Sequence, residues 1–142
     1  MIEQSITEFL LREGYVVSGF SGVSMMPMLD QRTDRLLILR VQAPVKKNDV
    51  VLYRRGDRLI LHRVLRVSGE RLVIRGDNCI RAERDMTQRD ILGMLSAYWQ
   101  GERYFECTDE WNAELARQAR KTYLRRLLVR VCRKLRRICT GS

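Results

Sequence analysis

The chain has 142 residues, of which 45% are apolar and 31% are charged, and its formal net charge is +10. This length fits one domain with a real hydrophobic core, and no run of eighteen apolar residues is present that would form a transmembrane helix. The excess charge is confined to the end of the chain, because residues 115–142 hold ten of the 27 basic residues and no acid.

The elements can be predicted in chain order. Apolar residues at helical spacing predict a helix over residues 2–13, and Gly14 is typical of a helix end. β-branched residues and leucine then predict strands at residues 15–17, 36–41, 50–54, 58–67, 71–75, 91–99 and 103–106. Asp109 is the predicted cap of a last helix over about 110–138. We therefore expect a mainly β (α+β) domain over residues 1–108 and a basic amphipathic helix within 109–142.

The cysteines and the N-terminus bear on cofactors and location. No C-x-x-C pair is present, and one histidine cannot complete the usual zinc ligand sets. We expect no metal or organic cofactor, and reduced thiols at Cys79, Cys107, Cys132 and Cys139. The first residues lack the basic start and the uninterrupted apolar centre of a secretory signal. The expected location is the cytoplasm, with peripheral attachment to a membrane left open.

Two residues have the chemistry of a nucleophile and its base. Ser24 lies in a G-x-S-M-x-P-x-L turn, and His62, the only histidine, lies in the strand pattern RLILHRVLRV. A serine hydroxyl becomes an effective nucleophile when a base removes its proton. Strand alternation places His62 on the same face as Ile60 and Val64, where burial keeps an imidazole neutral and therefore basic. Taken alone, Ser24 also fits a turn residue and His62 a half-buried strand residue.

Four blocks, in this order, resemble the superfamily of type I signal peptidases and LexA-like self-cleaving repressors. They are GVSMMPML, PVKKNDVVLYRR, LHRVLRV, and RGDNCIRAERD followed by RDILGML. Histidine at the base position resembles the branch typified by the endoplasmic-reticulum signal peptidase. The resemblance implies the coiled β-sheet domain of that superfamily. It also implies a Ser24–His62 pair that cleaves a peptide or precursor protein through an acyl-enzyme.

The resemblance also implies an acid, shortly after the GDN motif, that orients the imidazole. Asp85 is the favoured orienting acid and Asp77 the favoured structural support, while Glu83 and Asp77 stay open as alternatives for the orienting role. Whichever acid fills this role would fix the tautomer of His62.

Substrate contacts are implied at two positions. Gly22 stands where many signal peptidases have a serine, so the oxyanion hole is expected to use the backbone N–H of Ser24. Met25 resembles a substrate-pocket residue of the family. The alternative function is an inactive peptidase-like module that binds a peptide or acts as a scaffold. A self-cleaving repressor ranks last, because the segment before Ser24 leaves little room for a helix-turn-helix.

The basic end of the chain predicts an amphipathic helix. From Leu124 onward apolar residues recur every three or four positions, and arginines fill the other faces. One interpretation is a terminal helix docked on the sheet with a solvated basic face. The expected partners are an anionic membrane surface or an acidic protein, ahead of nucleic acid, because few aromatic residues are interleaved.

Overall fold

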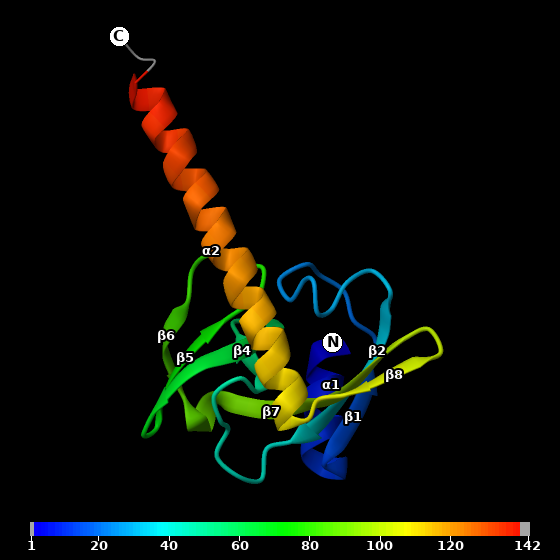
Figure 1. Ribbon diagram of the computed structural model, residues 1–142. Coiled ribbons are helices and arrows are strands. Elements are labelled where there is room, and N and C mark those ends of the chain that lie inside the picture. Colours follow the sequence, from blue (N-terminus) through cyan, green and yellow to red (C-terminus); the bar gives the residue numbers. More distant parts are fainter. Residues whose placement is uncertain (1, 140–142) are drawn as a thin grey trace.

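The computed structural model describes residues 2–139, which form two α-helices and a curled antiparallel sheet (Figure 1). Helix α1 (Ile2–Glu13) precedes the sheet and α2 (Asp109–Cys139) follows it. The strands are β1 (Tyr15–Ser18), β2 (Thr33–Arg40), β3 (Val50–Arg55), β4 (Arg58–Ser68), β5 (Arg71–Arg75), β6 (Glu83–Thr87), β7 (Ile91–Gln100) and β8 (Arg103–Glu106). A short 3₁₀ helix, η1 (Gln88–Asp90), connects β6 to β7. The expected mainly β, α+β class is confirmed.

Within the described residues the strand order is β1-β2-β7-β3-β4-β5-β6, and β8 pairs with the far end of β7. Strand β6 is absent from the sequence-based expectation. Its residues Glu83, Arg84 and Asp85 are charged, and it pairs only with β5 at the edge of the sheet. Charged side chains are common on edge strands because they discourage pairing with other chains, and they also hide the apolar alternation.

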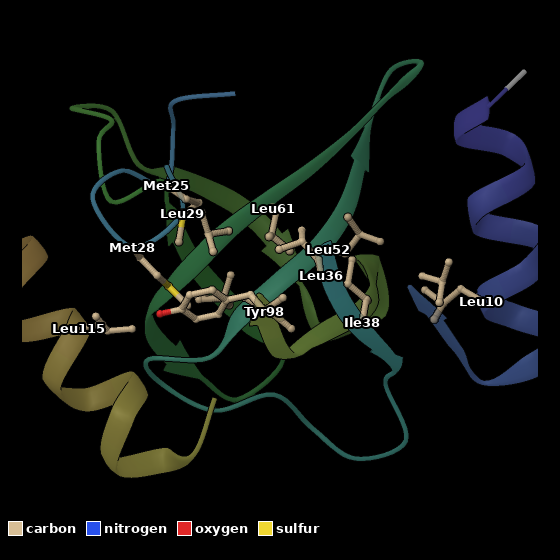
Figure 2. Close-up of a cluster of buried hydrophobic side chains, with 13 residues drawn as sticks. Leu10, Met25, Met28, Leu29, Leu36, Ile38, Leu52, Leu61, Tyr98 and Leu115 are labelled. Carbon is tan, nitrogen blue, oxygen red and sulfur yellow. The ribbon is translucent and has the colours of Figure 1, made fainter. Parts of the chain in front are cut away.

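The curled sheet encloses apolar side chains on both of its faces. In β3, Val50 and Leu52 pack into one cluster, whereas Val51 and Tyr53 pack into a second cluster on the opposite face. Figure 2 shows the first cluster between the two helices, with Leu10 of α1 at one end and Leu115 of α2 at the other. Both faces of β3 are therefore buried, and β3 positions the groups that surround the candidate site.

Helix α2 packs on the domain only through its first part. Its buried residues are Asn112, Leu115 and Ala119. The expected cap at Asp109 is wrong by one position: the side chain of Thr108 accepts a hydrogen bond from the N–H of Trp111 at 3.1 Å. Beyond the sheet the helix continues as an extended projection (Figure 1). No helix within residues 2–139 combines the length and apolar composition needed to cross a membrane.

Candidate active site

The serine turn, residues 22–29, connects β1 to β2 and is anchored by its apolar side chains. Met25, Met28 and Leu29 are buried in the first cluster, where Figure 2 shows them together. Gly22 has φ +126°, a left-handed conformation that favours glycine. Because these apolar side chains hold one side of the turn in the core, Ser24 lies half-buried at the edge of the core.

Met25 requires a correction to the substrate contact implied by the sequence. Its side chain is 0% exposed and packs in the core, and it does not line the groove that contains Ser24. A completely buried side chain cannot contact a substrate without repacking, so we assign Met25 to anchoring the turn. Gly22 does line the groove.

The loop after β5 brings the serine turn against His62. The backbone N–H of Asn78 donates a hydrogen bond to the carbonyl oxygen of Ser24 at 2.7 Å. The side-chain amide of Asn78 donates to the carbonyl oxygen of Val23 at 2.8 Å. A Cβ added to Gly76 would lie 2.6 Å from the Ser24 carbonyl oxygen and 2.8 Å from Nε2 of His62. Both residues therefore border the same small space, which only glycine leaves open.

The side chains of Ser24 and His62 line the same groove without being bonded to each other. Within residues 2–139 the hydroxyl of Ser24 forms no hydrogen bond, including to Nε2 of His62. Catalytic hydrogen bonds are often long or absent before substrate binds. The N–H of Ser24 is likewise not engaged within this part of the chain, so it is available as an oxyanion donor.

The other ring nitrogen of His62 faces a hydrogen-bonded pair. Nδ1 lies 2.9 Å from the hydroxyl of Tyr53, which donates to a carboxylate oxygen of Glu83 at 2.6 Å. A phenol has one proton, so a hydroxyl that donates to Glu83 must accept from Nδ1–H. This chain of bonds favours the tautomer that carries its proton on Nδ1. It leaves the Nε2 lone pair directed toward the serine turn.

The acid beside the imidazole is Glu83. One of its oxygens lies 3.8 Å from Nδ1, and its other oxygen accepts a hydrogen bond from Nε of Arg55 at 3.0 Å. Asp85, the acid favoured from the sequence, is 69% exposed and binds Arg55 at 3.0 Å. Arg55 lowers the pKa of Asp85 through these hydrogen bonds. Asp85 therefore lies further from the imidazole than Glu83 does, and Arg55 binds both carboxylates.

Burial decides the protonation state of the His62 imidazole. The side chain of His62 is 12% exposed, and desolvation lowers its pKa, although the negative charges of Glu83 and Asp77 oppose that shift. Burial and the hydrogen bond to Glu83 raise the pKa of Tyr53, so its hydroxyl keeps its proton. The imidazole is therefore neutral at neutral pH, as a general base must be.

On the opposite face of β4, an arginine holds the loop in place. Arg63 is 1% exposed and donates two hydrogen bonds to Asp77, from Nε at 2.8 Å and from Nη2 at 2.7 Å. It also donates to the carbonyl oxygen of Asn112 in α2 at 3.3 Å, and its Nη2 lies 3.2 Å from the sulfur of Met28. Both oxygens of Asp77 therefore bind Arg63, and this pair joins β4, the loop, α2 and the serine turn.

A second nucleophile lies beside the imidazole. The sulfur of Cys79 is 4.0 Å from Nε2 of His62, and burial raises the pKa of this thiol. A thiol with a raised pKa is a poor nucleophile at neutral pH because little thiolate is present. All four cysteines are free, and no cluster able to hold a metal ion occurs within residues 2–139.

Ser24 and His62 line the same groove, which has a volume of about 740 Å³. Its walls are mostly apolar and come from α1, the segment before Ser24, and strands β2, β3 and β4. The apolar contributors include Ile6, Phe20, Leu36, Ile38 and Leu52. A groove of this size and character suits an extended peptide with small or apolar side chains.

Sequence reasoning missed four contributors to this site, which are Tyr53, Arg55, Arg63 and Asn78. Arg63 had a readable signal: it immediately follows His62 in a strand, so alternation places its charge on the opposite, buried face. Tyr53 had no such signal, because a tyrosine in a strand is usually part of the core.

No protein-family model and no curated protein matches this chain.

Proposed function

We propose that this chain is a serine endopeptidase with the domain type of signal peptidases and LexA-like repressors, in which Ser24 is the nucleophile and His62 the general base. The observation that carries the proposal is the position of Gly76, whose missing side chain leaves the Ser24 turn and Nε2 of His62 in contact with one space. The resemblance of the four sequence blocks and the shared groove support it.

The proposed reaction follows from the available groups. Nε2 of His62 takes the hydroxyl proton while Oγ of Ser24 bonds to the peptide carbonyl carbon. The negative charge that develops on the carbonyl oxygen is stabilised by the N–H of Ser24. The imidazolium then returns the proton to the leaving amine nitrogen as the C–N bond breaks. Water hydrolyses the acyl-enzyme with His62 again acting as base.

In this proposal, Tyr53 and Glu83 together replace the acid that usually orients the histidine. When His62 becomes an imidazolium, its Nδ1–H donates to the hydroxyl of Tyr53, which in turn donates to Glu83. Through the hydroxyl of Tyr53, the carboxylate of Glu83 therefore stabilises the imidazolium without a direct hydrogen bond to the ring. Arg55 holds Glu83 in position from β3.

The alternative is a peptide-binding module that uses the same groove without catalysis. The apolar groove of about 740 Å³ suffices for this candidate, which needs no hydrogen bond between the Ser24 hydroxyl and His62. The two candidates differ in one measurable product, because only the peptidase forms a covalent acyl-Ser24 species.

The first experiment incubates the purified chain with an activated ester and with peptides that carry small residues at the position to be cut. Intact-protein mass spectrometry detects acylation, and peptide mapping locates it. We expect acylation and cleavage in the wild type and in Ser21→Ala. We expect both to fall at least about 100-fold in Ser24→Ala and His62→Ala.

Cys79→Ala provides the control for the competing nucleophile, and it should retain activity within about threefold because Cys79 only borders the imidazole. Labelling that follows Cys79 instead of Ser24 would overturn the assignment of the nucleophile. No acylation and no cleavage in the wild type, together with saturable peptide binding that leaves the peptide intact, would support the binding module.

A further inference from the structure

The second half of α2, residues 124–139, extends away from the sheet and contains no buried residue. The buried residues of α2 all precede this segment, and every residue from Leu128 to Cys139 is exposed. Figure 1 shows this segment projecting well beyond the sheet. Large apolar side chains are among the exposed residues, with Leu128 at 65%, Leu135 at 55% and Ile138 at 66%. Such a segment needs a partner that covers its apolar side chains.

Apolar and basic residues occupy opposite sides of this segment. At about 100° per residue, its apolar side chains, with the exception of Val129, fall within an arc of roughly 140°. They are Leu124, Leu127, Leu128, Val131, Cys132, Leu135, Ile138 and Cys139. The remaining arc holds the basic residues Arg125, Arg126, Arg130, Arg133, Lys134, Arg136 and Arg137. The segment contains no acidic residue.

We propose that residues 124–139 bind to the surface of a membrane that contains anionic lipids, with the apolar arc inserted at the interface. A helix with this segregation lies in the plane of the interface, with its apolar side chains among the acyl chains. Its basic residues then contact the lipid phosphates, and the absence of acids removes any repulsion from them.

A second copy of the chain fits this surface poorly. Arg125 and Arg136 flank one edge of the apolar arc and Lys134 flanks the other. Paired helices would therefore bring cations against cations at the positions that normally hold opposite charges in a coiled coil. An anionic surface satisfies both arcs of the helix at once, so we commit to the membrane.

The helix leaves the domain beside the candidate site. Arg126 donates hydrogen bonds to Asn78, including one to its carbonyl oxygen at 3.3 Å, and Asn78 holds the carbonyl oxygen of Ser24 at 2.7 Å. A membrane-bound helix would keep the groove near the lipid surface. If the proposed function holds, the substrate would be a precursor displayed at that surface. Vesicle binding by the helix does not depend on that function.

The test is cosedimentation of the full chain with vesicles of phosphatidylcholine alone and with vesicles that contain one quarter phosphatidylserine. We expect binding to the anionic vesicles at 50 mM salt and at least a tenfold weaker binding at 500 mM salt, because salt screens the attraction. Binding to phosphatidylcholine alone should be weaker by a similar factor.

Two double variants test the two arcs. Arg130→Glu with Arg133→Glu, and Leu128→Gln with Leu135→Gln, should each weaken binding by at least about tenfold. The matched control is Arg66→Glu with Arg71→Glu, which makes the same change in net charge at exposed positions of β4 and β5. This control should retain binding within about threefold, and circular dichroism verifies that each variant is folded.

Three results would overturn the proposal: no binding of the wild type to anionic vesicles at low salt, equal losses in the control and the helix variants, or a stable dimer in light scattering that the Leu128 and Leu135 changes dissolve. Acylation of Ser24 is measured separately on the same samples. A helix variant that loses vesicle binding while it keeps acylation supports the membrane proposal independently of the peptidase proposal.

Discussion

The hydroxyl of Tyr53 lies 2.9 Å from Nδ1 of His62 and at the same time donates to Glu83 at 2.6 Å. A residue of the buried second cluster is thereby connected to an imidazole at the edge of the groove. Because one phenolic proton cannot serve two acceptors, the Glu83 contact determines which nitrogen of His62 is left free to act as a base.

Removing the hydroxyl of Tyr53 tests this connection. In Tyr53→Phe the ring and its packing stay, but Nδ1–H loses its acceptor and the tautomer is no longer fixed. We expect the rate of Ser24 acylation to fall about 10- to 100-fold with little change in peptide affinity. Single-turnover kinetics would measure the rate, and an unchanged rate would show that the bond to Tyr53 is structural only.

The two acids held by Arg55 give a matched pair of variants. Glu83→Gln removes the charge that faces His62, whereas Asp85→Asn removes an exposed charge that pairs with Arg55. We expect Glu83→Gln to reduce acylation at least about tenfold and Asp85→Asn to change it less than about threefold. A larger loss in Asp85→Asn would instead support the acid favoured by the sequence.

The pH dependence of acylation has a definite sign. Burial lowers the pKa of His62 from the ordinary value of 6.5, and the base is active only when neutral, so the acid limb of the profile should have its midpoint below 6.5. The negative charge of Glu83 raises the pKa of His62 and so opposes the effect of burial. Glu83→Gln should therefore move the midpoint further toward acid pH. A shift of the midpoint to higher pH in that variant would contradict the described environment.

Gly76→Ala tests the close approach between the serine turn and the imidazole. The new Cβ would meet the Ser24 carbonyl oxygen at 2.6 Å and Nε2 of His62 at 2.8 Å, so the two must separate. We expect a destabilisation of about 1–3 kcal/mol and a loss of acylation of at least about 30-fold.

Gly101→Ala is the control for this substitution. Unlike Gly76, Gly101 has a positive φ, of +62°, and a Cβ there meets nothing within 4 Å. This variant should lose about 1 kcal/mol of stability and keep acylation, as urea denaturation and the labelling assay would measure. Equal losses of acylation in both variants would mean that the Gly76 effect reports only on stability.

The buried ion pair of Arg63 and Asp77 predicts that removing one charge costs more stability than removing both charges together. Asp77→Asn leaves the charge of Arg63 buried without its counter-ion, and we expect a loss of about 3–5 kcal/mol. Arg63→Met combined with Asp77→Leu removes both charges and should cost less than Asp77→Asn alone. Urea denaturation of the wild type and the two variants tests this, and a double variant that loses as much stability as Asp77→Asn, or more, would contradict it.

Much of the fold could be read directly from the sequence. The period of the apolar residues predicted both helices and the seven strands other than β6, because backbone geometry ties each period to one type of element. The alternation in β4 also predicted that His62 shares a face with Ile60 and Val64. Both of these pack in the second cluster with Tyr53, the residue that contacts Nδ1.

The tertiary structure alone decided which groups surround His62. Asp85 and Glu83 are two residues apart in β6, and nothing in their local sequence distinguishes them. The pairing of β5 with β6 and the position of Arg55 on β3 bring Glu83 to the imidazole and leave Asp85 exposed. Local periodicity determines an element and its faces. The choice of a partner depends on register and sheet curvature, which arise from contacts between residues far apart in the chain.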